Sequence, residues 1–381
     1  MDLLAAPGIL ANFAVGTLLP FFFVLMLVVF VHELGHYLVG RWCGIHAVAF
    51  AVGFGPEIVG FTDRRGTRWK LCAIPLGGYV RYLGDLNVAS QPGGQEVLAR
   101  MTPDERRRSF PAAALWKRAL AVAAGPGFNF VFAILIFAGV FMAYGQERID
   151  PIVTEVAEDS AAEAAGFEVG DLLLFADETP IESFGDLQRY VQPRSEREIA
   201  FRVERDGGEL TLVATPERIE REDRFGNTLT MGVLGIRTAR NEDTVVVERY
   251  GPISALGEAV RETGFVVRRT GTYLWDEVIG RGETDQIGGP IRIAQVSGQV
   301  ATLGIVALVN LAALLSISIG LINLLPVPIL DGGHLLFYAF EAVLGRPLSP
   351  ATQEIGFKVG LFLILSLMVF ATWNDISLLL G

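Results

Sequence analysis

Four long apolar runs stand out against the mixed pattern of the rest of the chain. They cover residues 18–38, 120–143, 302–325 and 355–371, and few charged residues fall within them. A helix that crosses a bilayer needs about 20 mostly apolar residues. Each run therefore predicts one membrane span.

Two stretches between these runs have patterns typical of β structure. Residues 45–82 alternate small apolar residues, aromatics and glycines around a charged turn at residues 63–66, which predicts hairpin-like strands. Residues 146–218 predict a small α/β module. Its elements are a strand at 152–156, a helix at 160–167, a turn and strand at 169–175, a second helix at 184–191, and a hairpin at 200–214.

The chain between this module and the third run divides into two parts. Residues 219–250 are polar and charged, and residues 253–278 show helical periodicity. The second part predicts an amphipathic helix on the outer membrane surface. Its role, as part of a substrate gate or as a connector, stays open.

Composition and charge support a membrane protein and indicate its orientation. The chain is 51% hydrophobic and 19% charged, whereas soluble domains carry about 25% charged residues. Residues 41–118 have a net charge of +6, and residues 145–300 have a net charge of −13. Lys and Arg near spans mark the cytoplasmic side. We therefore expect 41–118 in the cytoplasm and both termini outside it.

The same charge pattern gives no indication of nucleic-acid binding, because the basic cluster at residues 106–118 is explained by topology. The two cysteines, Cys43 and Cys72, both fall in the predicted cytoplasmic loop, where thiols stay reduced. Two isolated cysteines form no metal motif.

The strongest chemical signal lies in the last third of the first apolar run, at His32-Glu33-Leu34-Gly35-His36. Residues four apart share one helix face, so His32 and His36 can bind one zinc ion with Glu33 beside it as general base. An ionisable side chain at membrane depth costs at least ~2.5 kcal/mol. A bound metal relieves that cost; the alternative is a helix end whose polar side chains reach water.

Asp331 is the candidate third ligand, because a catalytic zinc site takes three protein ligands and one open position. Pro326 and Pro328 end the third apolar run just before it. Gly332 and Gly333 follow it and permit unusual backbone angles. The alternative is an ordinary turn aspartate. His334 is a candidate for the second layer around the metal, and His46 is expected to be structural or exposed.

This set of residues predicts hydrolysis. Zinc lowers the pKa of a bound water and polarises a carbonyl group. Glu33 would take the proton of the water and pass it to the leaving amine. Asn323 would donate a hydrogen bond to the substrate backbone or to a developing oxyanion.

Several motifs together resemble the site-2 protease family of intramembrane metalloproteases, in particular its RseP-type bacterial members. The resemblance runs nearly end to end, through HELGH at 32–36, GFGP at 53–56, IPLGGYV at 74–80, Gly125-Pro126 with Asn129, GGP at 288–290 and NLLPVPILDGG at 323–333. It implies one zinc ion per chain, with His32, His36 and Asp331 as ligands and Glu33 as base. It also implies a membrane-re-entrant β segment. We expect the exposed strand edge of residues 45–82 to hold an unwound substrate by β-augmentation, and the alternative is a structural cytoplasmic loop. The predicted substrate-binding residues are Gly53, Phe54, Gly55 and Asn323.

The predicted fold is a polytopic α-helical membrane protein with four spans, a re-entrant β segment, and an inserted extracytoplasmic PDZ α/β domain. The order of elements in 146–218 resembles a PDZ domain, which binds extended chain ends by strand addition. RseP-type proteins can carry two such domains in tandem, whereas this chain has room for one. The predicted segments are a first span at 1–44, the β segment and its loop at 45–112, a second span at 113–145, the PDZ domain at 146–218, a connector at 219–300, a third span with the aspartate motif at 301–334, and a fourth span at 335–381.

The resemblance implies a multi-pass protein of the bacterial inner membrane that cleaves single-pass membrane proteins, such as pre-trimmed anti-sigma factors and remnant signal peptides. The active site is expected near the cytoplasmic side, and the PDZ domain is expected in the periplasm, as a peptide sensor, a size filter or a space-filling fold. One alternative is a zinc hydrolase that acts on other peptides or on lipids at the membrane face. A second alternative is a catalytically silent scaffold that binds chain ends through the PDZ domain.

Overall fold

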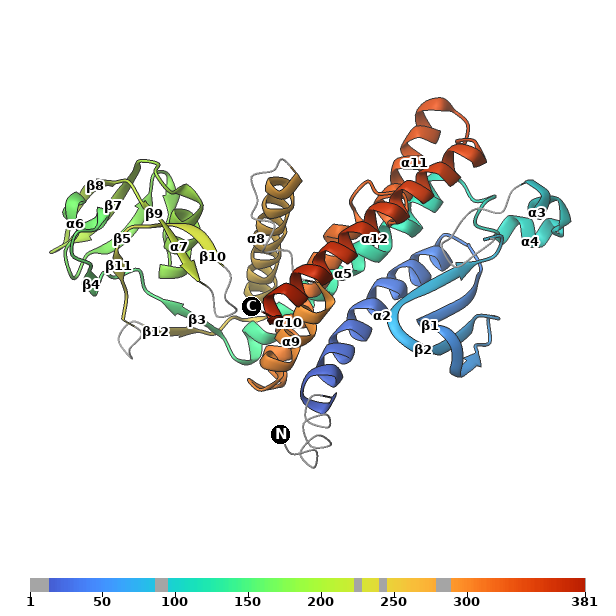
Figure 1. Cartoon of the computed structure of the whole chain (residues 1–381), viewed down its shortest axis with the longest axis horizontal. Helices are drawn as coiled ribbons and strands as arrows, with labels where there is room; N and C mark the ends of the chain where they lie inside the picture. Colours follow the sequence, from blue (N-terminus) through green and yellow to red (C-terminus); the bar gives the residue numbers. More distant parts are fainter. Residues whose placement is uncertain (1–13, 86–94, 223–227, 240–244, 279–288, 381) are drawn as a thin grey trace. The chain divides into compact units, whose positions relative to one another are not determined.

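Contacts within the chain define two units. A computed structural model describes residues 14–85, 95–222, 228–239, 245–278 and 289–380. The first unit joins the N-terminal part, up to Val140, to the C-terminal part, from Pro252 onward. The second unit, Phe141–Gly251, is inserted between them in the sequence (Figure 1).

Helices make up most of the first unit. Four of its helical segments are long and apolar enough to cross a membrane: Val15–Trp42, Leu115–Ala143, Ile305–Asn323 and Pro350–Ser377. The prediction of four membrane-spanning helices is confirmed by the length and composition of these segments. The elements of the unit are η1 Ala14–Leu18, α2 Leu19–Trp42, β1 Ala47–Thr62, β2 Arg68–Tyr82, α3 Gln95–Arg100, α4 Pro103–Arg108, α5 Leu115–Ala143, α8 Pro252–Val278, α9 Pro290–Ala301, α10 Ile305–Asn323, α11 Asp331–Leu344 and α12 Pro350–Leu380.

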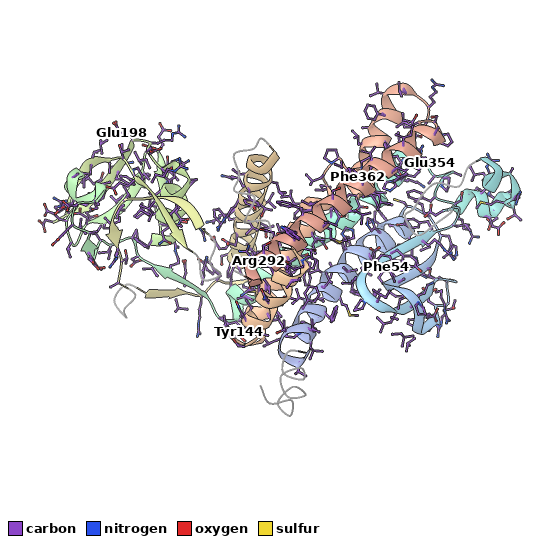
Figure 2. All side chains as sticks on the ribbon, in the orientation of Figure 1. Phe54, Tyr144, Glu198, Arg292, Glu354 and Phe362 are labelled. Carbon is purple, nitrogen blue, oxygen red and sulfur yellow. The ribbon has the colours of Figure 1, made fainter. Side chains whose placement is uncertain are left out.

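The apolar side chains of α12 remain largely outside the protein core. Phe362 is 70% exposed and Val369 is 68% exposed, and Figure 2 marks Phe362 on this helix. A contiguous apolar surface of this kind would be unfavourable in water. It fits a helix that faces lipid.

The third apolar run contains a helix break that the sequence pattern did not predict. Gly304, with a φ of 103°, separates α9 from α10, so the spanning helix begins at Ile305 and not at Thr302. The buried Asp375 of α12 accepts hydrogen bonds from the backbone N–H groups of Gly289, Ile291 and Arg292. These bonds satisfy donors at the start of α9 that have no partner within the helix.

Strands β1 and β2 form the antiparallel hairpin predicted for residues 45–82. Residues 49–52 of β1 pair with two stretches of β2, residues 78–81 and residues 68–71, and the end of β1, residues 57–62, pairs with residues 68–72. The hairpin packs against α2 (Figure 1). Its Phe50 is buried between Tyr37 of α2 and Trp69 of β2.

Asp63 organises the turn of this hairpin. Its carboxylate accepts hydrogen bonds from the backbone N–H groups of Arg65 and Thr67, from the indole of Trp69, and from the hydroxyl of Tyr37. Burial opposes ionisation of this carboxyl, but the four donors outweigh burial and lower its pKa to about 2. The ionised side chain thus ties the hairpin to α2.

The second unit has a four-stranded antiparallel core with the strand order β6-β5-β7-β8. Phe167, Leu173, Leu187 and Phe201 are buried in its core. The predicted helix 184–191 is α7, and the predicted helix 160–167 is the shorter α6, with Ser160 as its N-cap and Gly166 ending it at a φ of 85°. The elements are β3 Gln146–Ile149, β4 Glu155–Val156, α6 Ala161–Ala165, β5 Leu172–Ala176, β6 Thr179–Pro180, α7 Phe184–Val191, η2 Gln192–Arg194, β7 Ile199–Arg205, β8 Gly208–Ala214, β9 Glu217–Glu222, β10 Thr228–Val233, β11 Ile236–Arg237 and β12 Val245–Glu248.

This unit extends beyond residue 218, the predicted end of the α/β module. Strand β11 pairs with β4, β12 pairs with β3, and Leu234 is buried in the core. The polar character of 219–250 concealed these strands, because their partners lie about 80 to 100 residues earlier in the chain. Residues 1–13, 86–94, 223–227, 240–244 and 279–288 belong to the predicted segments but lie outside the described residues, as does Gly288 of the GGP motif.

The low pKa of Asp63 predicts an acid-dependent loss of stability. A carboxyl whose pKa is lower in the folded protein than in the unfolded chain stabilises the fold above its unfolded pKa of about 3.8, and this stabilisation disappears as pH falls toward 2. We expect Asp63→Asn to lower the thermal unfolding midpoint at pH 5 to 7. The difference from the parent should shrink between pH 4 and pH 2.

Asp104→Asn is the matched control for this measurement, because Asp104 lies on α4 with a side chain that is 62% exposed. Both variants are followed by tryptophan fluorescence in the same detergent. A midpoint difference for Asp63→Asn that stays constant from pH 6 to pH 2 would contradict the assigned role of the ionised carboxylate.

Candidate metal and catalytic site

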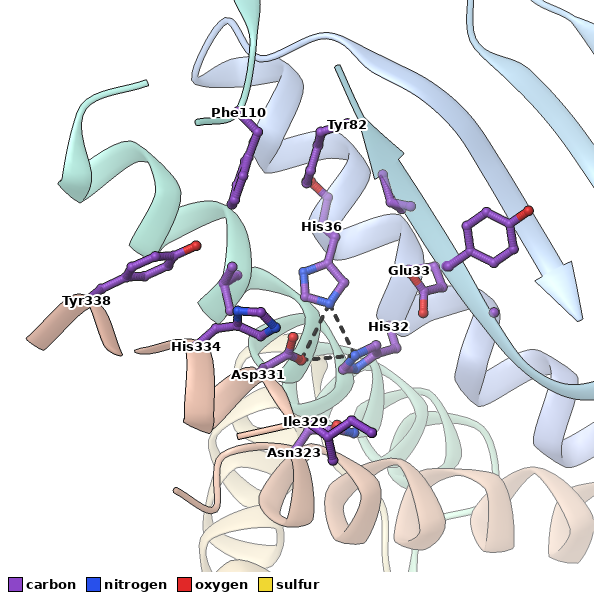
Figure 3. Close-up of a pocket in the computed structure, with 14 residues that line it drawn as sticks. His32, Glu33, His36, Tyr82, Phe110, Asn323, Ile329, Asp331, His334 and Tyr338 are labelled. Atoms are coloured by element: carbon purple, nitrogen blue, oxygen red, sulfur yellow. Dashed lines mark hydrogen bonds and ion pairs between the residues drawn. The ribbon is translucent and has the colours of Figure 1, made fainter. Parts of the chain in front are cut away.

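Three side chains from two distant parts of the sequence meet at one point. His32 and His36 lie one turn apart on α2, and Asp331 is the first residue of α11. The Nε2 atom of His32 is 3.1 Å from Oδ2 of Asp331, and Nε2 of His36 is 3.4 Å from the same oxygen. The two Nε2 atoms are 3.2 Å apart. Figure 3 shows this triangle as dashed lines.

These separations fit a metal ion. Ligand atoms about 2.0–2.2 Å from a tetrahedral zinc ion lie about 3.3–3.6 Å from one another. The three observed distances fall within 0.2 Å of this range, and the donor atoms are the imidazole nitrogens and carboxylate oxygen that zinc accepts. The structure thus brings together the three predicted ligands in an arrangement that suits zinc.

Helix α5 supports the two histidines from behind. The backbone carbonyl of Ala121 accepts a hydrogen bond from Nδ1 of His36 at 2.9 Å. The side-chain amide of Asn129 lies 3.3 Å from Nδ1 of His32. Both rings therefore use Nδ1 for a contact with α5 and direct Nε2 toward Asp331.

This contact depends on a glycine in α5. A Cβ atom on Gly125 would lie 2.3 Å from Nε2 of His36 and 2.9 Å from Cε1 of His32, much closer than van der Waals contact. Gly125 therefore leaves the space in which the two imidazoles converge. The sequence offered only the Gly125-Pro126 motif as a signal, without the reason for it.

Glu33 lies beside the three ligands in a cavity of about 220 Å³. Figure 3 shows its carboxylate on the β2 side of the cavity, next to His32. Gly78 of β2 permits this approach, because a Cβ there would lie 3.0 Å from Cγ of Glu33 and 2.8 Å from the carbonyl oxygen of Ala51. Only 8% of Glu33 is exposed, so its carboxylate faces the cavity and not bulk solvent.

Asp331 reaches the cavity because α10 ends at Asn323 and the chain turns back before α11. Pro326 and Pro328 occupy this break, as predicted. Gly332 and Gly333 do not adopt the unusual backbone angles that glycine permits, because neither residue has a positive φ and both lie in α11. Their Cβ atoms would instead lie 2.3 Å from the carbonyl oxygens of Leu324 and Val327, respectively. The two glycines allow α11 to start directly against the preceding turn.

The remaining predicted site residues divide into two groups. Asn323 lines the cavity, where its amide donates to the carbonyl of Ile319. Gly53, Phe54 and Gly55 lie on β1, outside the residues that line this cavity. Gly53 and Gly55 have positive φ values of 87° and 85°, and Phe54 is partly exposed and stacks on Tyr79. A direct role of these three in substrate binding stays a prediction.

Further residues line the cavity: His334, the predicted candidate for the second layer, and Tyr82 and Tyr338, which the sequence did not predict as part of the site. Tyr82 of β2 donates a hydrogen bond to the backbone carbonyl of His36 and stacks on Phe110. His334 and Tyr338 form the α11 side of the cavity, opposite Glu33 (Figure 3). The i, i+3 and i, i+7 spacing from Asp331 was the available signal for these two side chains.

Substitution of Gly125 tests the metal site directly. We expect Gly125→Ala to retain less than a tenth of the parent's zinc, because the added methyl group would occupy the position of the His36 ring. Gly127→Ala is the control, since a Cβ at Gly127 on the same helix has no atom within 4 Å. Both changes raise helix propensity by a similar amount, about 1 kcal/mol.

Zinc per chain is measured by mass spectrometry after purification in the same detergent, with size exclusion as a check of folding. A folded Gly125→Ala protein with the parent's zinc content would contradict the proposed convergence of the two histidines at this position.

Comparison with known proteins places this site in a family. Residues 20–367 match the model of Peptidase family M50. A proposed zinc metalloprotease of Agrobacterium fabrum is 54% identical over 379 residues, which cover 100% of this chain and 99% of the relative. A second, from Rhizobium meliloti, is 53% identical over 96% of this chain and 97% of the relative. Metalloprotease MmpA of Caulobacter vibrioides is 41% identical over 94% of this chain and 95% of its own length. The chain therefore belongs to Peptidase family M50, the site-2 protease family, and is a multi-pass membrane zinc metalloendopeptidase.

Proposed function

We propose that this protein cleaves single-pass membrane proteins within or beside the bilayer, with Glu33 as general base and with His32, His36 and Asp331 as zinc ligands. The observation that carries the proposal is the position of the site. Its two histidines and Glu33 lie on a helix that is long and apolar enough to span a membrane. A peptide bond must come to that depth to be cut.

The chemistry follows from the residues around the cavity. Zinc held by the three ligands would supply an acidified water and a Lewis acid for the scissile carbonyl. Glu33 takes the proton of the attacking water and delivers it to the leaving amine. Asn323 offers an amide donor on the α10 side of the cavity, where it can bind substrate backbone or the developing oxyanion.

A helical substrate must be unwound before this chemistry can occur, because its peptide groups are engaged in helical hydrogen bonds. Gly78, Tyr79 and Val80 of β2 line the cavity. Residues 78–81 pair on one side with residues 49–52 of β1, and among the described residues no other strand pairs with their second edge. An unwound segment that pairs with this edge would run past Glu33. This supports a re-entrant β segment that holds substrate.

The proposed substrates are pre-trimmed anti-sigma factors and remnant signal peptides, in the inner membrane of a bacterium. The second unit would then be a periplasmic PDZ domain that senses chain ends or limits substrate size. Its support is the order of strand and helix in residues 155–214 and the antiparallel sheet β6-β5-β7-β8. The scaffold alternative is disfavoured, because the chain is a zinc metalloendopeptidase and the described residues include the complete ligand set beside Glu33.

Replacement of Glu33 tests the proposed base. The parent and Glu33→Gln proteins are reconstituted in lipid vesicles with a single-pass model substrate, and zinc is measured on the same samples. We expect about one zinc per chain in both, and a rate of cutting at least about 100-fold lower in Glu33→Gln, because general acid–base catalysis contributes about 10²–10⁴-fold.

Glu354→Gln serves as the control, since Glu354 is an exposed residue of α12 that pairs only with Lys358 among described residues. Mass spectrometry of the products locates the cut. A cut remote from the apolar segment and its flanks would contradict cleavage within or beside the bilayer. A zinc-loaded Glu33→Gln protein with full activity would exclude Glu33 as the base.

The orientation of the chain is tested with an impermeant thiol reagent on intact spheroplasts. Cys43 and Cys72 are both buried, so the background from native thiols is expected to be low. We expect a cysteine at Glu198, an exposed position of the second unit, to react rapidly. A cysteine at Asp104 of α4 should react only after the membrane is permeabilised. The reverse pattern would invert the proposed topology.

A further inference from the structure

The two histidines of the site are held in similar ways, but only one of the two contacts fixes the position of a proton. A backbone carbonyl can only accept a hydrogen bond. The contact of Nδ1 of His36 with the carbonyl of Ala121 therefore requires a proton on Nδ1 of that ring. Its Nε2 then carries a lone pair, which faces Oδ2 of Asp331 and is ready to bind a cation.

The same tautomer is required of His32. Its Nε2 is the atom that meets His36 and Asp331, so this nitrogen must carry the lone pair and Nδ1 must carry the proton. The neighbour of Nδ1 is the side-chain amide of Asn129, at 3.3 Å. An amide nitrogen at that position would place two donors face to face. An amide oxygen there would accept the proton of Nδ1.

The surroundings of Asn129 restrict its side chain to two orientations, with either the amide oxygen or the amide nitrogen facing Nδ1 of His32. Asn129 has no exposed surface. Ser316 of α10 donates a hydrogen bond to its backbone carbonyl, and Gly320 of α10 lies so close that a Cβ there would be 3.1 Å from Cβ of Asn129. With the amide nitrogen toward His32, Oδ1 is buried and accepts no hydrogen bond from the described residues. A half-turn about the Cβ–Cγ bond exchanges oxygen and nitrogen in nearly the same volume.

We propose that Asn129 is a positioning residue that presents its side-chain carbonyl oxygen to Nδ1–H of His32 and thereby holds His32 in the tautomer that binds zinc through Nε2. Helix α5 would then fix both histidines, through a backbone carbonyl at Ala121 and a side-chain carbonyl at Asn129. Partners of this kind change metal affinity about 10–100-fold in other metal sites. The inference rests on the zinc ligands of the proposed function, and its readout is metal affinity and not cleavage.

Zinc affinity of three variants provides the first test, at one fixed pH and by competition with a chelator of known affinity. Asn129→Leu keeps a similar volume but offers no acceptor, and we expect its zinc dissociation constant to rise about 10–100-fold. Asn129→Asp can only accept when ionised, and we expect it to bind zinc at least tenfold more tightly than Asn129→Leu. Ser316→Ala removes a neighbouring bond of the same residue and should bind zinc like the parent.

Two results would overturn the proposal. One is an Asn129→Leu protein that binds zinc as tightly as the parent. The other is an Asn129→Asp protein that binds zinc as weakly as Asn129→Leu, because a role in packing alone predicts no rescue by an acceptor. If Asn129→Leu fails to fold, the zinc affinity of Asn129→Asp relative to the parent still distinguishes the two roles. If His32 required a hydrogen-bond donor at this position, the aspartate variant would bind zinc more weakly than the parent.

Nitrogen NMR of the histidine rings gives an independent readout. The chain has four histidines, so labelling with ¹⁵N-histidine produces a simple spectrum, and His46 and His334 are assigned by substitution. In the zinc-loaded parent we expect both His32 and His36 to carry the proton on Nδ1. A proton on Nε2 of His32 in that state would refute the proposal even if Asn129→Leu lost zinc. A protein that binds zinc in this way but cuts no membrane substrate would leave this inference intact and remove the proposed function.

Discussion

The central constraint on this protein is that ionisable side chains within an apolar span must satisfy one another. His32, Glu33 and His36 together would be costly at membrane depth, where even one such group costs at least ~2.5 kcal/mol. Asp331 answers this by placing one carboxylate oxygen within 3.4 Å of both imidazoles. Most of the surrounding architecture serves that meeting point. The break between α10 and α11 brings Asp331 to the site, and α5 contacts the Nδ1 atoms of both histidine rings.

The convergence depends on residues that have no side chain. Gly125 leaves the volume for two imidazoles, Gly78 lets β2 lie against Glu33, and Gly332 and Gly333 let α11 begin directly after the turn at residues 324–330. In each case the close neighbour of the missing Cβ includes backbone or a ligand ring, which cannot move away cheaply. The placement of two imidazoles and two carboxylates therefore relies on at least four glycines contributed by three separate elements. Close helix packing through small residues is common in membranes, where apolar side chains gain little by leaving lipid.

The sequence predicted what local pattern and chemistry determine. Apolar runs gave the four spans, Ser160 and Gly166 marked the ends of α6, and the HELGH motif with Asp331 identified the three residues that meet in space. It did not predict the separate helix α9 or the late strands that complete the second unit, because these depend on partners far away in the chain. For the same reason the roles of Gly125, Tyr82 and Asn129 became visible only with the fold. The histidines touch α5 at positions that no periodicity relates to α2.

The two walls of the cavity come from different elements, β2 and α11. On the β2 side, the edge of residues 78–81 lies beside Glu33 of α2, so this is the wall along which an extended peptide could lie. The opposite wall is one face of α11, where Asp331, His334 and Tyr338 follow at helical spacing. Arg118 of α5 lies over the ring of Tyr338 and pairs with Glu341, so this wall is itself tied to the helix that supports the histidines. Strand β2 also contacts the ligand helix, because Tyr82 donates a hydrogen bond to the backbone carbonyl of His36. A displacement of β2 would therefore change both how substrate meets Glu33 and how His36 is supported. Metal binding and substrate access are thus linked through β2.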